Sequence, residues 1–124
     1  MILIAQPAQA EWIELGQNND GTKHYLDPES IRIDGDYRKY WALTNYSKSQ
    51  KNGESSNKKR VEIDCKQEQY RFLSIIGYSK HMGRGEVVWS VGSDNEWMQI
   101  PPSTLINDFL EIVCNWGVYK SPRK

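Results

Sequence analysis

The spacing of apolar residues changes once along this chain, and that change constrains the fold more than any other feature. Before residue 100 apolar and polar residues alternate, as in the segment VEIDC at 61–65, and a period of two predicts half-buried β-strands. From Ser103 to Gly117 the apolar residues recur every three or four positions, which predicts an amphipathic helix. A run of strands followed by one helix indicates an α+β domain.

Turn residues divide the strand region into short candidates. Asp34-Gly35 is a two-residue hairpin signal, so the strand that follows it should pair back on the strand before it. The polar stretch 47–59 has no large apolar residue, and we expect a mobile hairpin loop whose deletion leaves the fold intact. The expected fold is an antiparallel, meander-like sheet of about six strands with the C-terminal helix packed on one face. The strand candidates are 12–15, 22–26, 31–33, 37–48, 61–65, 70–80, 87–91 and 96–100.

The chain has two cysteines, and each lies on the expected core side of its element. Cys65 follows the alternation of its strand, and Cys114 lies in the last turn of the helix beside the apolar stripe. A disulfide between them would tether the helix to the sheet, and closing a loop of about 50 residues corresponds to about 4 kcal/mol in the chain-entropy model. Two free buried thiols are the alternative.

Residues 1–10 (MILIAQPAQA) resemble the end of a secretory signal peptide with an A-x-A cleavage site. A frayed arm or a first strand is the alternative. We expect a signal remnant or disordered arm at 1–10, one domain at 11–119 and a disordered tail at 120–124. No cysteine follows the apolar run to carry an acyl chain, so we expect a periplasmic or secreted protein and not a lipoprotein.

Composition and motif content argue against several functions. Sixteen basic and sixteen acidic side chains give no net charge to attract nucleic acid, and no apolar run approaches the roughly 20 residues that cross a bilayer. His24 and His81 are the only histidines, and their spacing from the cysteines fits no zinc motif. The adjacent His81-Met82 pair is better explained as part of a loop than as haem or copper ligands. Since disulfide cysteines supply no thiolate and no G-x-S-x-G elbow occurs, we expect no enzyme, cofactor or metal site.

Aromatic residues are the best candidates for binding. Five Trp and seven Tyr accompany only two Phe, and such amphipathic rings suit both sheet packing and protein interfaces. The candidate contacts are Tyr40, Tyr46, Trp89 and Trp97, with core packing as the alternative use for each.

Several short motifs together resemble the bacterial surface-adhesin protein E family. They are Glu11-Trp12, 25–31 (YLDPESI), Tyr40-Trp41, 61–65 (VEIDC), Tyr70-Arg71, 83–85 (GRG), Trp97, 100–103 (IPPS) and Cys114. The resemblance implies an antiparallel sheet with a disulfide-tethered C-terminal helix and a non-enzymatic envelope protein. It also implies, through the adhesin members, binding to host matrix or serum proteins.

Two functions follow as hypotheses. The first is a cell-envelope binding domain that recognises a protein or a small ligand. The second is an accessory or assembly protein of an envelope complex, which acts through a sheet edge or as a homodimer.

Overall fold

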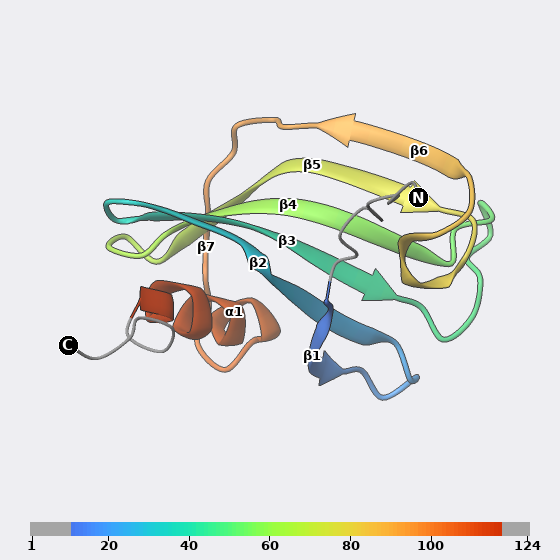
Figure 1. Ribbon diagram of the computed structural model, residues 1–124, viewed down its shortest axis with the longest axis horizontal. Coiled ribbons are helices and arrows are strands. Elements are labelled where there is room, and N and C mark those ends of the chain that lie inside the picture. The colour runs from blue at the N-terminus through green and yellow to red at the C-terminus, as the bar shows by residue number, and fades with distance from the viewer. Residues whose placement is uncertain (1–10, 118–124) are drawn as a thin grey trace, which may run out of the picture.

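Antiparallel pairing organises residues 11–117, which are the residues that the structure, a computed structural model, describes. Seven strands form one sheet in the order β1-β2-β3-β4-β5-β6, and β7 pairs with β5 beside β6 (Figure 1). The strands are β1 (Ile13–Gln17), β2 (Lys23–Asp34), β3 (Tyr37–Asn45), β4 (Ser56–Asp64), β5 (Gln69–Tyr78), β6 (Val87–Gly92) and β7 (Met98–Gln99). A short 3-10 helix, η1 (His81–Gly83), precedes β6, and the helix α1 (Leu105–Cys114) follows β7. The predicted antiparallel meander with a C-terminal helix is confirmed.

The predicted hairpin joins β2 to β3, but its two-residue loop is Gly35-Asp36, one position later than the predicted Asp34-Gly35. Asp34 pairs with Tyr37, and Gly35 has a φ of 57°, a left-handed value that glycine adopts without steric cost. The next pair, β3 with β4, keeps a regular register from Tyr37 opposite Asp64 to Asn45 opposite Ser56. These central strands therefore provide the most regular part of the sheet.

One long strand, β2, replaces the two short strands expected at 22–26 and 31–33. The register shifts between Asp27 and Arg32, where Pro28 has no backbone N–H to offer to β3. Ser30 fills this irregularity, because its hydroxyl donates to the Asp27 carbonyl at 2.6 Å and accepts from the Trp41 N–H at 2.8 Å. The side chain of Ser30 thus holds the two halves of β2 against β3.

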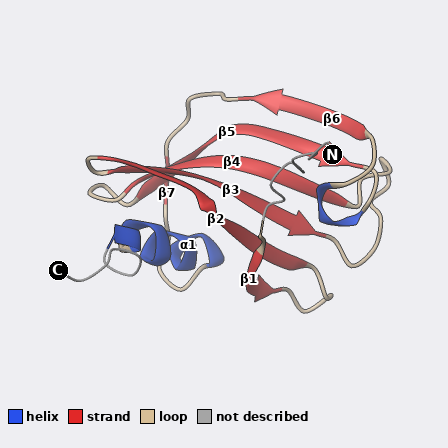
Figure 2. Cartoon of the chain, viewed as in Figure 1, coloured by secondary structure: helices blue, strands red, loops and turns tan. Residues whose placement is uncertain are grey.

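The helix α1 lies across one face of the sheet, below its left part in Figure 2. The Thr104 hydroxyl caps its first turn by accepting from the Asn107 N–H at 3.3 Å. Phe109 and Val113 are the buried helix residues, and the Phe109 ring stacks on Tyr40 with centroids 5.4 Å apart. Burial of this apolar stripe against the sheet is what stabilises so short a helix. The buried core comprises Leu26, Ile31, Tyr40, Ala42, Val61, Ile63, Ile100, Phe109 and Val113.

Two further contacts fix the C-terminal end of α1. The predicted disulfide is present, with Cys65 directly after β4 bonded to Cys114 and their Cα atoms 5.9 Å apart. The Arg38 guanidinium of β3 donates from Nε to the Val113 carbonyl at 3.0 Å, where a cation also favours the helix dipole. The helix is therefore anchored by a covalent bond and by a charged hydrogen bond.

The prediction of a mobile loop at 47–59 is wrong for the second half of that segment. Ser56 begins β4, and Glu54, Ser55 and Asn57 are buried. Hydrogen bonds make this burial possible: the Ser55 N–H donates to the Tyr78 carbonyl at 2.8 Å, and the Ser49 and Ser55 hydroxyls are 2.7 Å apart. A deletion through residue 59 would remove a central strand segment.

The signal remnant predicted at 1–10 and the tail predicted at 120–124 lie outside the described residues. No helix among residues 11–117 is long and apolar enough to cross a bilayer.

Candidate functional site

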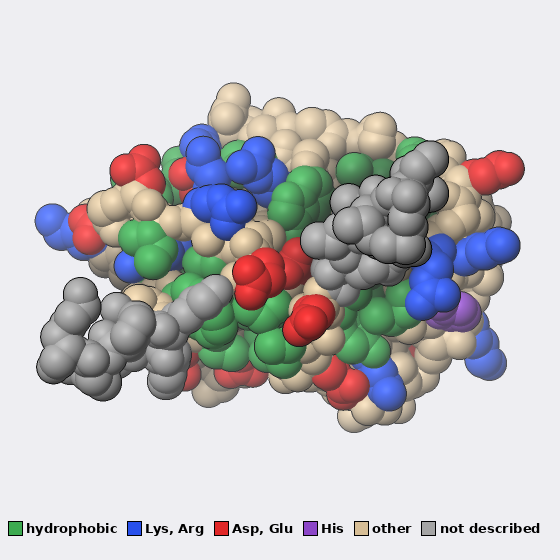
Figure 3. Space-filling view, in the orientation of Figure 1, with side chains coloured by type: hydrophobic (Ala, Val, Ile, Leu, Met, Phe, Trp, Pro, Cys, Tyr) green, Lys and Arg blue, Asp and Glu red, His purple; other side chains and the backbone are tan. Residues whose placement is uncertain are grey.

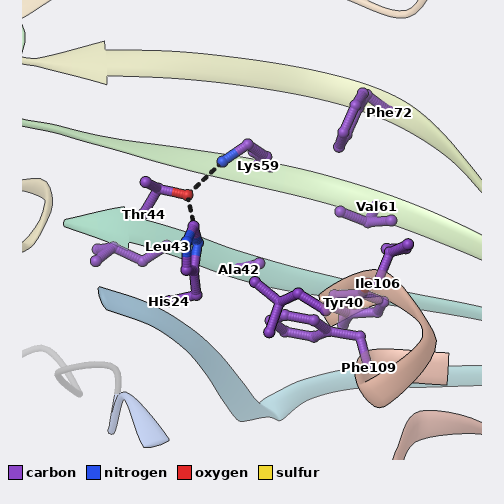
Figure 4. Close-up of a pocket in the computed structure, with 11 residues that line it drawn as sticks. His24, Tyr40, Ala42, Leu43, Thr44, Lys59, Val61, Phe72, Ile106 and Phe109 are labelled. Carbon is purple, nitrogen blue, oxygen red and sulfur yellow. Dashed lines mark hydrogen bonds between the residues drawn. The ribbon is translucent and has the colours of Figure 1, made fainter. Parts of the chain in front are cut away.

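A pocket of about 260 Å³ lies between α1 and the sheet, on the face that we call the helix side (Figure 4). Four strands and the helix contribute to its wall, so residues far apart in sequence meet there. The lining residues are His24 of β2, Tyr40, Ala42, Leu43 and Thr44 of β3, Lys59 and Val61 of β4, Phe72 of β5, and Leu105, Ile106 and Phe109 of α1. All but three of them are apolar or aromatic.

The three remaining residues form a polar end. The Lys59 amine donates to the Thr44 hydroxyl and to the Asn57 side-chain carbonyl, both at 2.6 Å. His24 Nδ1 lies 3.2 Å from the same hydroxyl, and His24 Nε2 lies 3.1 Å from Asn18 Oδ1. This geometry fits a neutral His24 protonated on Nε2, which donates to Asn18 and accepts from Thr44.

Burial shifts both titratable groups at this end. It lowers the pKa of the Lys59 amine from 10.5 to about 8, although the Glu54 carboxylate opposes part of the shift. Burial also lowers the pKa of His24, and the charge of Lys59 lowers it further. Near neutral pH the polar end therefore carries a charged lysine beside an uncharged histidine.

A second polar cluster adjoins the pocket through Asn57. The buried Glu54 carboxylate accepts from Asn57 Nδ2 at 2.9 Å and from the Trp89 indole N–H at 3.1 Å. Asn57 Nδ2 also donates to the Tyr46 hydroxyl at 3.1 Å. Two of the predicted contact residues, Tyr46 and Trp89, are thus held by one acid and one amide beside the polar end.

The Trp89 indole lies over Gly77 of β5, and this close approach yields a prediction. A Cβ atom at Gly77 would come within 2.8 Å of the indole ring, so Gly77→Ala must displace Trp89 from Glu54. Forced repacking of this kind costs about 1–3 kcal/mol, which urea denaturation would measure. Gly92→Ala in β6 is the matched control, because nothing lies within 4 Å of its Cβ position. Equal stability of the two variants would contradict the contact.

Trp97 occupies a different site, just before β7. The Arg71 guanidinium stacks over its ring at 4.5 Å, and the Tyr37 ring lies 6.0 Å away. Arg71 also forms a salt bridge to Glu62 at 2.7 Å. Trp97 is partly exposed and remains a candidate contact.

The four predicted contact residues therefore do not form one patch. Tyr40 is only 1% exposed and stacks on Phe109 in the pocket wall, so it is part of the core. Tyr46 and Trp89 share the Glu54 cluster, and Trp97 belongs to the Arg71 cluster. Within residues 11–117, no three His, Cys, Asp or Glu side chains gather where they would hold a metal ion.

Comparison with known proteins identifies the family. Residues 12–115, a span that holds every strand and the helix, match the surface-adhesin protein E family. The chain belongs to this family. The resemblance predicted from the sequence is thereby confirmed, and no curated protein sequence matches the chain at a significant level.

Solved structures of Haemophilus influenzae protein E share the fold of this adhesin E domain. Crystal form II gives a TM-score of 0.66 at 20% identity, covering 94% of this chain and 99% of that chain. Another structure of the same protein gives a TM-score of 0.65 at 18% identity, covering 98% of this chain and 96% of that chain. Protein E from non-typeable Haemophilus influenzae gives a TM-score of 0.63 at 19% identity, covering 96% of this chain and 86% of that chain. At such low identity the likeness establishes the fold alone.

Sequence reasoning missed the polar end of the pocket in this adhesin E domain. Lys59 and Asn57 belong to the polar run 56–60 (SNKKR), and a run of this composition predicts a loop. One signal was available, because extending the alternation back from Val61 puts both residues on the core side of the strand. Thr44 and His24 then follow from strand register, which the sequence does not fix.

Proposed function

We propose that this protein is a non-enzymatic, exported binding domain that captures a partner protein by strand addition at the β6 edge. The family assignment supports a surface-adhesin role, and the partner at β6 is the finer step proposed here. Strand addition uses the unpaired backbone groups of an edge strand for affinity and its side chains for specificity.

The observation that carries this proposal is the unprotected character of β6. Its only paired neighbour is β5, so its other side faces outward at the upper rim of the molecule in Figure 1. The sequence of β6, VVWSVG, contains no charge and no proline, and in Figure 3 charged side chains appear only toward the two ends of the upper rim. Val87 and Val91 are 58% and 51% exposed. Proteins usually protect an edge of this kind unless another chain pairs with it.

The opposite edge, β1, is protected. Its register shifts between Glu14 and Gly16, and the Glu14 carboxylate pairs with Lys23 at 3.8 Å. The Leu105 side chain of α1 packs against Gly16, which leaves no room for a Cβ there. The second half of β2, which continues this edge beyond Leu26, carries Pro28 and the charged residues Glu29, Arg32 and Asp34. An irregular edge with charges and a proline is a poor template, so β6 is the better site for a partner.

Val91→Lys tests the site, since an inward or edge lysine is a natural block to strand addition. We expect binding to matrix or serum proteins, each immobilised separately, to weaken at least about tenfold. The strand that the partner adds to β6 would have to cover the charged lysine at position 91. Ile33→Lys is the matched control, as Ile33 is equally exposed at 52% but lies in β2, which β3, β4 and β5 separate from β6. Equal binding by both variants and the parent protein would contradict the proposal.

Light scattering over a range of concentrations addresses the alternative of an assembly protein. In one outcome the parent protein reaches twice the monomer mass at high concentration while Val91→Lys stays at the monomer mass. This pair of results would assign the β6 edge to a homodimer of this chain. A constant monomer mass with Val91-dependent capture supports the binding domain.

We also propose a leader at 1–10, one domain at 11–119 and a disordered tail at 120–124, with the mature protein in the periplasm or outside the cell. The supporting observations are the A-x-A end of the leader and the Cys65–Cys114 disulfide, which suits an oxidising compartment. Expressed with its native upstream sequence, the protein should have the mass of a chain cleaved after Ala10 and should take up no alkylating reagent. An uncleaved chain with two reactive thiols would contradict export.

A further inference from the structure

We infer that the helix-side pocket binds a small amphipathic carboxylate, with the carboxylate on Lys59 and the apolar chain between α1 and the sheet. This inference concerns a different surface from the β6 edge and does not depend on the proposed function.

Lys59 has no ion-pair partner among residues 11–117. Its amine has three N–H donors and two neutral acceptors, Thr44 and Asn57. In the described part of the chain no carboxylate lies within ion-pairing distance of it. The Glu54 carboxylate raises the pKa of Lys59 from beyond ion-pairing distance, and its oxygens already accept from Asn57 and Trp89. A partly buried ammonium in an apolar wall therefore has one donor left for an anion.

The remainder of the pocket is apolar. Beyond the amine, the wall consists of Tyr40, Ala42, Val61, Phe72, Leu105, Ile106 and Phe109. Figure 4 shows Lys59, Thr44 and His24 together at one end and the Tyr40 and Phe109 rings at the other. A cavity of about 260 Å³ is slightly smaller than the sites of drug-sized ligands, which suits a short alkyl or aryl chain. Lys59 and His24 stay partly exposed, so the polar end is open to solvent.

The charges at the polar end indicate which ligand head group the pocket would hold. Lys59 supplies a single positive charge, His24 beside it is neutral near pH 7, and α1 contributes only apolar side chains to the wall. A singly charged carboxylate balances this site, whereas a phosphate would bring about two charges and need further donors. The titratable groups that face Lys59 are His24 from β2, Tyr40 from β3 and, through Asn57, Glu54 from the loop before β4. Loss of the lysine proton is thus the main expected cause of weaker binding at alkaline pH.

Calorimetric titration with octanoate tests the inference, with 1-octanol and octyl phosphate as comparison ligands. We expect octanoate to bind most tightly, and each methylene removed from its chain to weaken binding about three- to fourfold. Octanoate affinity should fall when the pH is raised past the Lys59 pKa of about 8, while octanol affinity stays constant. Tighter binding of octyl phosphate, or equal binding of octanoate and octanol, would overturn the head-group assignment.

Lys59→Met tests the residue, because methionine keeps the apolar stem and removes the charge. We expect at least about a tenfold loss of octanoate affinity, as for a charged hydrogen bond, with octanol binding retained. Lys58→Met is the matched control, since Lys58 is adjacent but lies over the Tyr78 ring outside this pocket. Retained octanol binding also shows that the variant is folded. Unchanged octanoate binding by Lys59→Met, or no octanoate binding by the parent protein, would overturn the inference.

Discussion

Replacing Cys65 and Cys114 together with alanine is expected to lower the free energy of unfolding by about 4 kcal/mol. The bond closes a loop with a sequence separation of 49 residues, so its removal increases the freedom of the unfolded chain. The folded state also loses its covalent tie to the end of α1, where only Phe109 and Val113 are fully buried on the helix. A loss of this size is comparable to much of the stability of a small domain.

Urea denaturation of the double variant beside the parent protein measures this effect. The parent protein under a thiol reductant is the control, and it should shift in the same direction, since both treatments open the same loop. The double replacement avoids leaving an unpaired thiol. A loss below about 1 kcal/mol would show that packing and the Arg38 contact anchor the helix without the disulfide.

Tyr40→Ala is expected to cost about 3–5 kcal/mol, whereas Tyr40→Phe should leave stability unchanged or raise it by about 1 kcal/mol. The Tyr40 ring is 1% exposed and stacks on Phe109, so alanine would leave a cavity beneath α1. Its hydroxyl is different, because among residues 11–117 this buried oxygen has no hydrogen-bond partner. Phenylalanine keeps the ring and removes the unsatisfied group.

Thermal and urea denaturation of both Tyr40 variants separate the ring from the hydroxyl. Helix content by circular dichroism in the alanine variant would show whether α1 remains docked. If Tyr40→Phe destabilised the protein by more than about 1 kcal/mol, the hydroxyl would have to make a hydrogen bond that the structure does not contain.

The fold was largely predictable because its main signals are local. Alternation through Val61 and Ile63 identifies a strand with one buried face, and the change of period after Pro102 identifies the helix. The Asp34-Gly35 signal predicted the β2–β3 hairpin but not its register, since the loop lies at Gly35-Asp36 and Asp34 pairs with Tyr37. Cys65 and Cys114 connect these local elements, which explains why the disulfide could be predicted along with the sheet and the helix.

The failures have a common cause, which is that tertiary hydrogen bonds allow polar residues to be buried. The run 56–60 resembles a loop in sequence, yet Ser56 and Asn57 are buried because partners at Lys80, in η1 and in the preceding loop satisfy them. The irregularity in β2 depends in the same way on the Ser30 side chain. Lys59 could be placed in the pocket only after such long-range pairing was known, and aromatic content gave no guide to it.

Hydrogen exchange at the backbone amides of β6 is the most direct test of the central claim that this adhesin E domain binds its partner at the β6 edge. The experiment compares the free protein with its complex with whichever matrix or serum protein it captures. We expect slower exchange on binding at residues 87–92, with exchange in β1 unchanged, because the added strand pairs the outward backbone groups of β6. Protection confined to β1 or to the far face of the sheet, with β6 unchanged, would contradict this claim.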